Sequence, residues 1–226
     1  MHIPDGYLSP STGGLFFVIM LPIWTAASNI VKRTLKVKQV PLMAIGAAFS
    51  FVIMMFNVPI PGGSTGHAIG GALLAILFGP WAATICVSVA LVVQALLFGD
   101  GGITAIGANC FNMAFVLPFT AYYIYKALSY RSSADSGWRP IAAGIAGYIG
   151  INLAALCAGT DFGVQPMLFH TATGQALYCP YPLNVAVPAM LGGHMMVFGW
   201  VEMIITALVI AYLQKQNPEM LKEGSR

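Results

Sequence analysis

Long apolar runs fill most of the chain and limit what it can fold into. We identify them at residues 12–31, 41–58, 67–79, 81–98, 103–127, 141–159 and 184–213. A helix needs about 20 consecutive apolar residues to cross the roughly 30 Å of hydrocarbon in a bilayer. Only 8% of the 226 residues are charged, whereas about 25% is usual for a soluble domain. The sequence therefore predicts an all-α integral membrane protein, a single-domain bundle (1–226) of about seven transmembrane helices.

The third run, 67–79, is too short to cross a bilayer unaided. Gly79 and Pro80 separate it from the fourth run. We expect a half-span there, which relies on neighbouring protein to satisfy its backbone hydrogen bonds.

The basic residues indicate how the bundle is oriented. They gather in three segments, which follow the first run, separate the fifth from the sixth, and follow the seventh. The ten are Lys32, Arg33, Lys36, Lys38, Lys126, Arg131, Arg139, Lys215, Lys222 and Arg226. Seven crossings put all three segments on one side, which the positive-inside rule makes the cytoplasm. We therefore expect a multi-pass protein of the cell membrane, with its N-terminus outside and its C-terminus cytoplasmic.

The chain starts with MHIPDGYLSP, which lacks the basic leader and the cleavage site of a secretory signal. We expect Met1 to be retained, because His2 is too large a second residue for initiator removal. The terminus then presents a free amine on the outer side of the membrane.

Three nitrogens at this terminus can chelate one metal ion. The Met1 amine, the His2 amide and an imidazole nitrogen of His2 close two fused chelate rings and fill three of four planar positions. Binding displaces protons, so affinity should fall as pH falls. A planar all-nitrogen set favours Ni(II) or Cu(II), whereas Zn(II) prefers a tetrahedron and Mg(II) or Ca(II) prefer oxygen.

His67 is the strongest candidate for the fourth nitrogen among the four histidines. It lies in VPIPGGSTGHAIGG, where an outer loop meets the third run. Proline and glycine break regular structure here, and Gly66 and Gly70 are spaced for close helix packing. Both features suit a loop folded back into the bundle. A packing and turn segment with an incidental histidine is an equally good interpretation.

Further polar residues are candidates for supporting the metal ligands. Ser64 and Thr65 either position the His67 loop or cap the third helix. Asp100, in the turn FGDGG, either orients an imidazole N–H or serves the turn itself. Asn109 lies in the fifth run, where hydrogen bonding between helices would by itself explain it.

Two ionisable residues lie within the last run. For His194 we favour a supporting or packing role over direct ligation. Glu202 is the one acid inside a run, and either a hydrogen bond within the bundle or contact with a partner subunit accounts for it.

Four segments together resemble a known family: MHIPDGYLSP, PIPGGSTGHAIGG, FGDGGITAIGANCFNM and VPAMLGGHMMVFGWVEMIIT. They look like the cobalt/nickel substrate-binding membrane subunits (CbiM/NikM) of prokaryotic energy-coupling-factor transporters, over essentially the whole chain. The resemblance implies a metal site at Met1, His2 and His67, with the N-terminal segment inserted into the bundle. The nickel members are the better match, with Co(II) as the alternative cargo.

The resemblance also implies partners: a transmembrane coupling subunit, a pair of cytoplasmic ATP-binding cassette ATPases, and a small accessory membrane subunit as a separate chain. The sequence has no G-x-x-x-x-G-K-[ST] loop, so we expect no ATPase activity in this chain. It also has no H-E-x-x-H motif, which argues against a membrane metalloprotease. We also expect contact with membrane lipid and no nucleic-acid partner. A stand-alone secondary transporter or channel is the alternative function.

Overall fold

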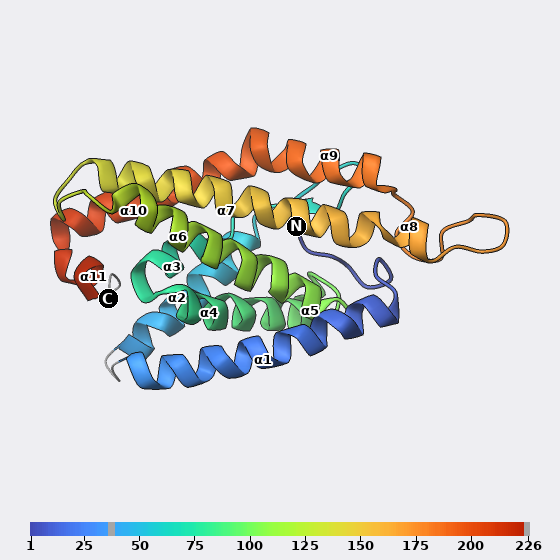
Figure 1. Cartoon of the computed structure of the whole chain (residues 1–226), viewed down its shortest axis with the longest axis horizontal. Coiled ribbons are helices and arrows are strands. Elements are labelled where there is room, and N and C mark those ends of the chain that lie inside the picture. The colour runs from blue at the N-terminus through green and yellow to red at the C-terminus, as the bar shows by residue number, and fades with distance from the viewer. Residues whose placement is uncertain (36–38, 224–226) are drawn as a thin grey trace.

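The computed structural model describes residues 1–35 and 39–223. Lys36, Lys38 and Arg226, counted above among the basic residues, lie outside this part of the chain. All seven apolar runs are occupied by helix, and the long helices lie side by side along the long axis of the molecule (Figure 1). The chain's N-terminus lies in the middle of the view and the end of α11 lies at one end (Figure 1).

The helices of the first half of the chain are α1 (Pro10–Thr34), α2 (Val40–Met54), α3 (Gly71–Phe78), α4 (Pro80–Val93), α5 (Ile106–Asn109) and α6 (Leu117–Ser129). Those of the second half are α7 (Trp138–Gly163), α8 (Gln165–Leu168), α9 (Leu183–Gly193), α10 (Gly199–Gln216) and α11 (Pro218–Glu223). Three π-helical segments continue or join them: η2 (Gln94–Phe98), η3 (Cys110–Val116) and η4 (His194–Phe198).

Four described helical stretches are long and apolar enough to cross a membrane. They are Pro10–Thr34, Pro80–Phe98, Trp138–Leu168 and Leu183–Gln216, and α2 is a shorter apolar helix. The helical bundle expected from the sequence is therefore confirmed. The count of seven crossings and the orientation stay predictions.

A short two-stranded sheet lies between α2 and α3, which the all-helical expectation did not include. Strands β1 (Val58–Pro59) and β2 (Thr65–Gly66) pair antiparallel, with Val58 opposite Gly66 and Pro59 opposite Thr65. The run expected over 41–58 stops being helical at Met54, because the prolines that follow cannot continue a helix. The hairpin brings the chain back into the bundle just before His67.

Helix α3 is the expected half-span. Its eight residues span about 12 Å, too little to cross a bilayer. All but the last of them are buried. A helix whose start is buried needs acceptors for its first N–H groups.

Glu202 of α10 supplies those acceptors. Its carboxyl oxygens accept hydrogen bonds from the backbone N–H groups of Ile69 (2.8 Å), Gly70 (2.9 Å) and Ala72 (3.4 Å). The first of the two roles left open for Glu202, a hydrogen bond within the bundle, is therefore the one observed. Through these bonds α10 fixes the backbone that directly follows His67.

Helix α7 lies between α6, α9 and α10 and packs closely through small residues. A Cβ atom on Gly144 would lie 2.9 Å from the carbonyl oxygen of Met203, and one on Gly150 would lie 3.0 Å from that of Leu117. Small residues let helix backbones approach in a membrane, where helix association depends on packing. The close packing keeps α10, and with it Glu202, in place.

We predict that Glu202→Ala destabilises the bundle. The substitution leaves three buried N–H groups without an acceptor, which should lower the free energy of unfolding by about 3 kcal/mol. Glu202→Gln, which keeps one acceptor oxygen, should lose less. Thermal unfolding of the purified protein in detergent measures both changes.

Thr206→Val is the matched control, one turn further along α10. The Thr206 hydroxyl is buried without a hydrogen-bond partner among the described residues, so its removal should cost little. An unchanged unfolding temperature for Glu202→Ala would contradict the role given to Glu202.

Candidate metal centre

The N-terminal segment before α1 is inserted into the bundle, as the resemblance implied. Met1 and Ile3 are 0% exposed and His2 is 3% exposed. A chain terminus is usually mobile unless specific contacts hold it. This terminus is therefore held by the contacts that its first residues make with the bundle.

Asn109 holds the segment at Ile3 with a pair of hydrogen bonds. The Ile3 N–H donates to Oδ1 of Asn109 (2.8 Å), and Nδ2 of Asn109 donates to the Ile3 carbonyl (3.1 Å). The same carbonyl also accepts from the N–H of Gly102 (2.8 Å). Asn109 thus binds the backbone of the N-terminal segment. These bonds are not the hydrogen bonds between helices that would also have explained this residue.

Two glycines leave room for the segment. A Cβ atom on Gly102 would lie 2.5 Å from the backbone nitrogen of Asp5, and one on Gly101 would lie 3.0 Å from the His2 ring. Gly101 also has φ +88°, a conformation that favours glycine. The glycines of FGDGG therefore allow the first residues of the chain to lie directly against this turn.

Asp5, three residues after His2, holds the segment at a further point. Its Oδ1 accepts from the backbone N–H (2.9 Å) and the hydroxyl (2.5 Å) of Thr104, and its Oδ2 accepts from the N–H of Ile103 (3.2 Å). These hydrogen bonds, that of the Thr104 hydroxyl foremost, hold the pKa of the Asp5 carboxyl below its usual value.

Ser64 and Thr65 contact the first two residues of the chain. The Met1 amine donates to the Thr65 hydroxyl (3.1 Å), and the Ser64 hydroxyl donates to the His2 carbonyl. Helix α3 begins after Gly70 and has no side-chain cap. The alternative that Ser64 and Thr65 cap the third helix is therefore wrong, and both residues position the N-terminal segment.

The His2 ring has one bonded and one free nitrogen. Nε2 lies 3.2 Å from Oε1 of Gln94, while Nδ1 is buried without a hydrogen-bond partner among the described residues. An amide oxygen only accepts, so this pair places the ring proton on Nε2 and the lone pair on Nδ1. Asp100 lies beside that lone pair, with Oδ1 3.5 Å from Nδ1.

Gln94 makes the hydrogen bond to the His2 ring that was one of two roles left open for Asp100. It is the first residue of η2 and is fully buried. One feature of the sequence could have indicated this role: Gln94 is the one large polar side chain in the run 81–98. Buried polar residues in a membrane helix need a partner, and here that partner is His2.

The His67 ring also has one bonded and one free nitrogen. It is fully buried, its Nδ1 lies 3.1 Å from the carbonyl oxygen of Ala68, and its Nε2 has no hydrogen-bond partner among the described residues. A carbonyl oxygen only accepts hydrogen bonds, so Nδ1 carries the ring proton and the free lone pair is on Nε2. The centroids of the His2 and His67 rings lie 4.5 Å apart, with an angle of 33° between the ring planes.

His194 begins η4 near this pair, and His170 does not approach it. The Nδ1 atom of His194 lies 2.8 Å from the Met190 carbonyl, and its Nε2 is buried without a partner in the described part of the chain. His170 is exposed, and its Nδ1 lies 3.2 Å from the Pro166 carbonyl. Three of the four histidines thus lie buried with a free ring nitrogen.

The protein interior disfavours positive charge on these nitrogens. Burial lowers the pKa of the Met1 amine well below its usual value, although the nearby Asp100 carboxyl opposes the shift. Burial, aided by the positive charge of the terminus, lowers the pKa of His2 to about 3. Burial also raises the pKa of Asp100. Burial therefore favours the neutral forms of the amine and the imidazole.

Side chains alone do not supply a complete metal site. Among the described residues no three His, Cys, Asp or Glu side chains lie close enough together to hold a metal ion. A metal ion between His2 and His67 would therefore need ligands besides these side chains.

The sequence matches the family model described as "Cobalt uptake substrate-specific transmembrane region", CbiM, over residues 2–220. The chain belongs to the CbiM family. The fused nickel transport protein NikMN of Rhodobacter capsulatus is 55% identical over 98% of this chain. The cobalt transport protein CbiM of Thermosipho melanesiensis is 36% identical over 99% of this chain and 91% of its own length.

This chain covers about two thirds of the length of its fused relatives. It covers 64% of the Rhodobacter protein and 66% of the probable fused nickel transport protein LarMN of Lactiplantibacillus plantarum, which is 50% identical to it. A crystal structure described as a truncated transition metal transporter superposes with a TM-score of 0.90 at 55% identity, covering 94% of this chain and 98% of that one. The two chains therefore share one fold.

We predict that Asn109→Ala loosens the N-terminal segment. Losing both hydrogen bonds to Ile3 should raise the rate at which an amine-reactive reagent labels Met1 by about tenfold, because opening the segment becomes easier. Mass spectrometry of the N-terminal peptide after a labelling pulse measures this rate.

Asn112→Ala is the matched control on the same helical stretch. Asn112 donates to Asp161 (2.7 Å) rather than to the N-terminal segment, so its loss should leave the labelling of Met1 unchanged. Equal labelling of the Asn109 variant and the unmodified protein would show that Asn109 does not hold the segment.

Proposed function

We propose that this chain captures Ni(II) outside the cell as the substrate-binding membrane component of an ATP-driven energy-coupling-factor transporter. The ion is bound by the Met1 amine, the His2 amide nitrogen, Nδ1 of His2 and Nε2 of His67. The observation that carries the proposal is the pair of buried, unpartnered nitrogens on two rings 4.5 Å apart, next to a buried chain terminus.

The protonation of His2 supports this ligand set. Fused chelate rings of five and six members can form through Nδ1 and not through Nε2, which points away from the backbone. Gln94 bonds Nε2 and leaves Nδ1 free. A partner on the outer nitrogen of a metal-binding histidine fixes the tautomer and the ring orientation.

The remaining contacts of the site hold the ligands in place. Thr65 contacts the Met1 amine, Ser64 contacts the His2 carbonyl, and Asn109 holds the next residue. Asp100 places a carboxyl group beside the bound cation, and His194 supports the site from η4 without binding the ion directly.

Four nitrogens in a plane favour Ni(II) over Zn(II), Mg(II) and Ca(II). Cu(II) should bind at least as tightly by the Irving–Williams order, so its low availability excludes it. Co(II) is the alternative cargo. The names of the relatives support both metals, since they include nickel and cobalt transport proteins.

Uptake needs partner chains in this proposal. A transmembrane coupling subunit and a pair of cytoplasmic ATPases reorient the loaded component, with a small accessory membrane subunit as a further partner. Placing the basic segments in the cytoplasm puts the metal centre on the outer half of the bundle, from which it can capture the ion.

We predict that one residue added before Met1 abolishes nickel binding. The extension moves the α-amine out of chelating distance, and the fully buried Met1 leaves no space for it. His2→Ala should have the same effect. Both variants should fold, and calorimetric titration with Ni(II) measures the loss. The loaded protein itself should be yellow and diamagnetic, as planar Ni(II) is.

His170→Ala is the control for this experiment, because His170 is an exposed histidine away from the site. It should bind nickel as the unmodified protein does. Full nickel stoichiometry in the extended protein would rule out the terminal amine as a ligand.

We predict that the chain by itself carries no nickel across a membrane. Liposomes containing only this protein should show no uptake, whereas liposomes that also contain the coupling subunit and the ATPase pair of the same organism should take up Ni(II) when ATP is enclosed. A radioactive nickel tracer measures both rates. Uptake by the chain alone would favour a stand-alone transporter or channel.

A further inference from the structure

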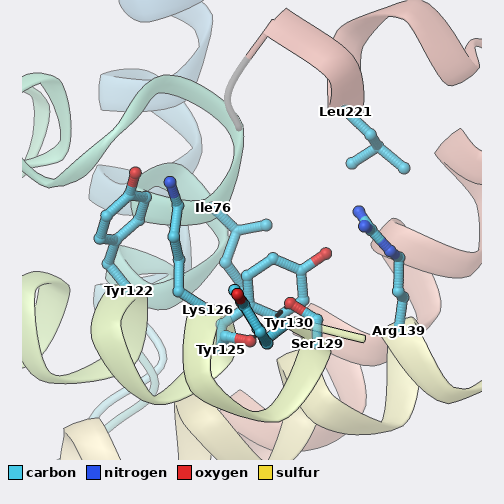
Figure 2. Close-up of a pocket in the computed structure, with 8 residues that line it drawn as sticks. All are labelled: Ile76, Tyr122, Tyr125, Lys126, Ser129, Tyr130, Arg139 and Leu221. Atoms are coloured by element: carbon cyan, nitrogen blue, oxygen red, sulfur yellow. Dashed lines mark hydrogen bonds between the residues drawn. The ribbon is translucent and has the colours of Figure 1, made fainter. Parts of the chain in front are cut away.

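A pocket of about 190 Å³ is lined in part by Leu221 of α11 (Figure 2), and α11 lies at one end of the bundle (Figure 1). It is separate from the metal centre and shares none of its residues. It is lined by Ile76, Tyr122, Tyr125, Lys126, Ser129, Tyr130, Arg139 and Leu221. The last turns of α6 provide most of this lining, and α3, α7 and α11 provide the rest.

Hydrogen bonds fix the walls of the pocket. The Ser129 hydroxyl donates to the Tyr125 carbonyl (2.6 Å), and Nε1 of Trp138 donates to the Leu128 carbonyl (2.9 Å). Gln214 of α10 donates to the loop between α6 and α7, at the carbonyls of Ala134 and Ser136. The pocket is therefore formed before any ligand enters.

Two cationic side chains stand on different sides of the pocket (Figure 2). Nη2 of Arg139 donates to the Ser132 carbonyl (3.2 Å), while its Nε is buried without a hydrogen-bond partner among the described residues. Nζ of Lys126 lies 5.1 Å from the centre of the Tyr122 ring. The positive charges of these two side chains in the described lining favour an anion.

The surroundings of the pocket are those of a membrane surface. Tyr130 is 83% exposed, Trp138 is 42% exposed and Leu128 is 38% exposed. Tyrosine and tryptophan gather where a membrane protein meets the lipid headgroups. Basic pockets between helices at that level bind lipid headgroups.

We propose that this pocket binds the phosphate group of an anionic phospholipid. The buried Nε–H of Arg139 and the fork of its guanidinium match phosphate oxygens, and Lys126 contributes a second positive charge. Ile76 and Leu221 offer apolar contact for the part of the lipid next to the phosphate. The pocket sits at an end of the bundle, so the proposal holds whichever side of the membrane that end faces.

A plainer role for the two cations is to neutralise the carbonyls at the C-terminal end of α6, where basic residues are favourable. In that case the cations stabilise the protein and bind no lipid. An experiment that measures lipid binding and folding separately distinguishes the two roles.

Native mass spectrometry of the full-length protein, stripped of lipid in detergent, tests the proposal. Added phosphatidylglycerol should bind the unmodified protein at one site, and Arg139→Gln should weaken that binding at least about tenfold through the lost charge-assisted hydrogen bonds. Arg139→Lys should weaken it less. Phosphatidylcholine, which has no net charge, should bind more weakly than phosphatidylglycerol.

Arg131→Gln is the matched control, since Arg131 is an exposed arginine in the segment between α6 and α7 and does not line the pocket. Unfolding temperatures without lipid show that each variant folds, and Arg139→Lys replaces Arg139→Gln if the latter does not. Equal lipid binding by the Arg139 and Arg131 variants would overturn the proposal. So would inorganic phosphate that binds in place of lipid, because the pocket would then take the free ion.

Discussion

The structure depends on the burial of the chain's own first residues. Met1, His2 and Ile3 lie inside the bundle, although a chain terminus carries an amine that water would solvate well. Asn109, Gly102 and the hydroxyls of the His67 loop replace water around them. The result is a buried group of nitrogens in which burial disfavours positive charge, and in which Nδ1 of His2 and Nε2 of His67 lack hydrogen-bond partners among the described residues.

The second constraint acts through α3, a helix too short to cross the membrane. Its buried start would leave backbone N–H groups without acceptors, and Glu202 accepts three of them. The same bonds hold the backbone at Ile69 and Gly70, directly after His67. One carboxyl group on α10 therefore keeps a half-span stable in the bundle and keeps one histidine at the metal centre.

Much of the site could be predicted from the sequence, because its chemistry is local. The nitrogens proposed to chelate the ion belong to the adjacent residues Met1 and His2 and need no tertiary contact to come together, and proline and glycine around His67 indicate a loop that folds back. Gln94 could not be assigned in this way, since its role depends on which ring nitrogen of His2 it meets across 92 positions of sequence. The hairpin before His67 was missed as well, because strands of two residues leave no periodic pattern.

The sequence by itself determined that the chain is an apolar helical bundle, because the length of its apolar runs and the scarcity of charge leave no soluble alternative. It also led to the proposal that nitrogens of Met1 and His2 chelate the ion. Only the tertiary structure decided that Asn109 holds the N-terminal segment, that Gln94 orients His2, and that Glu202 serves α3. These three pairings join residues far apart in the chain, and a hydrogen bond between distant residues exists only once packing has brought its donor and acceptor together.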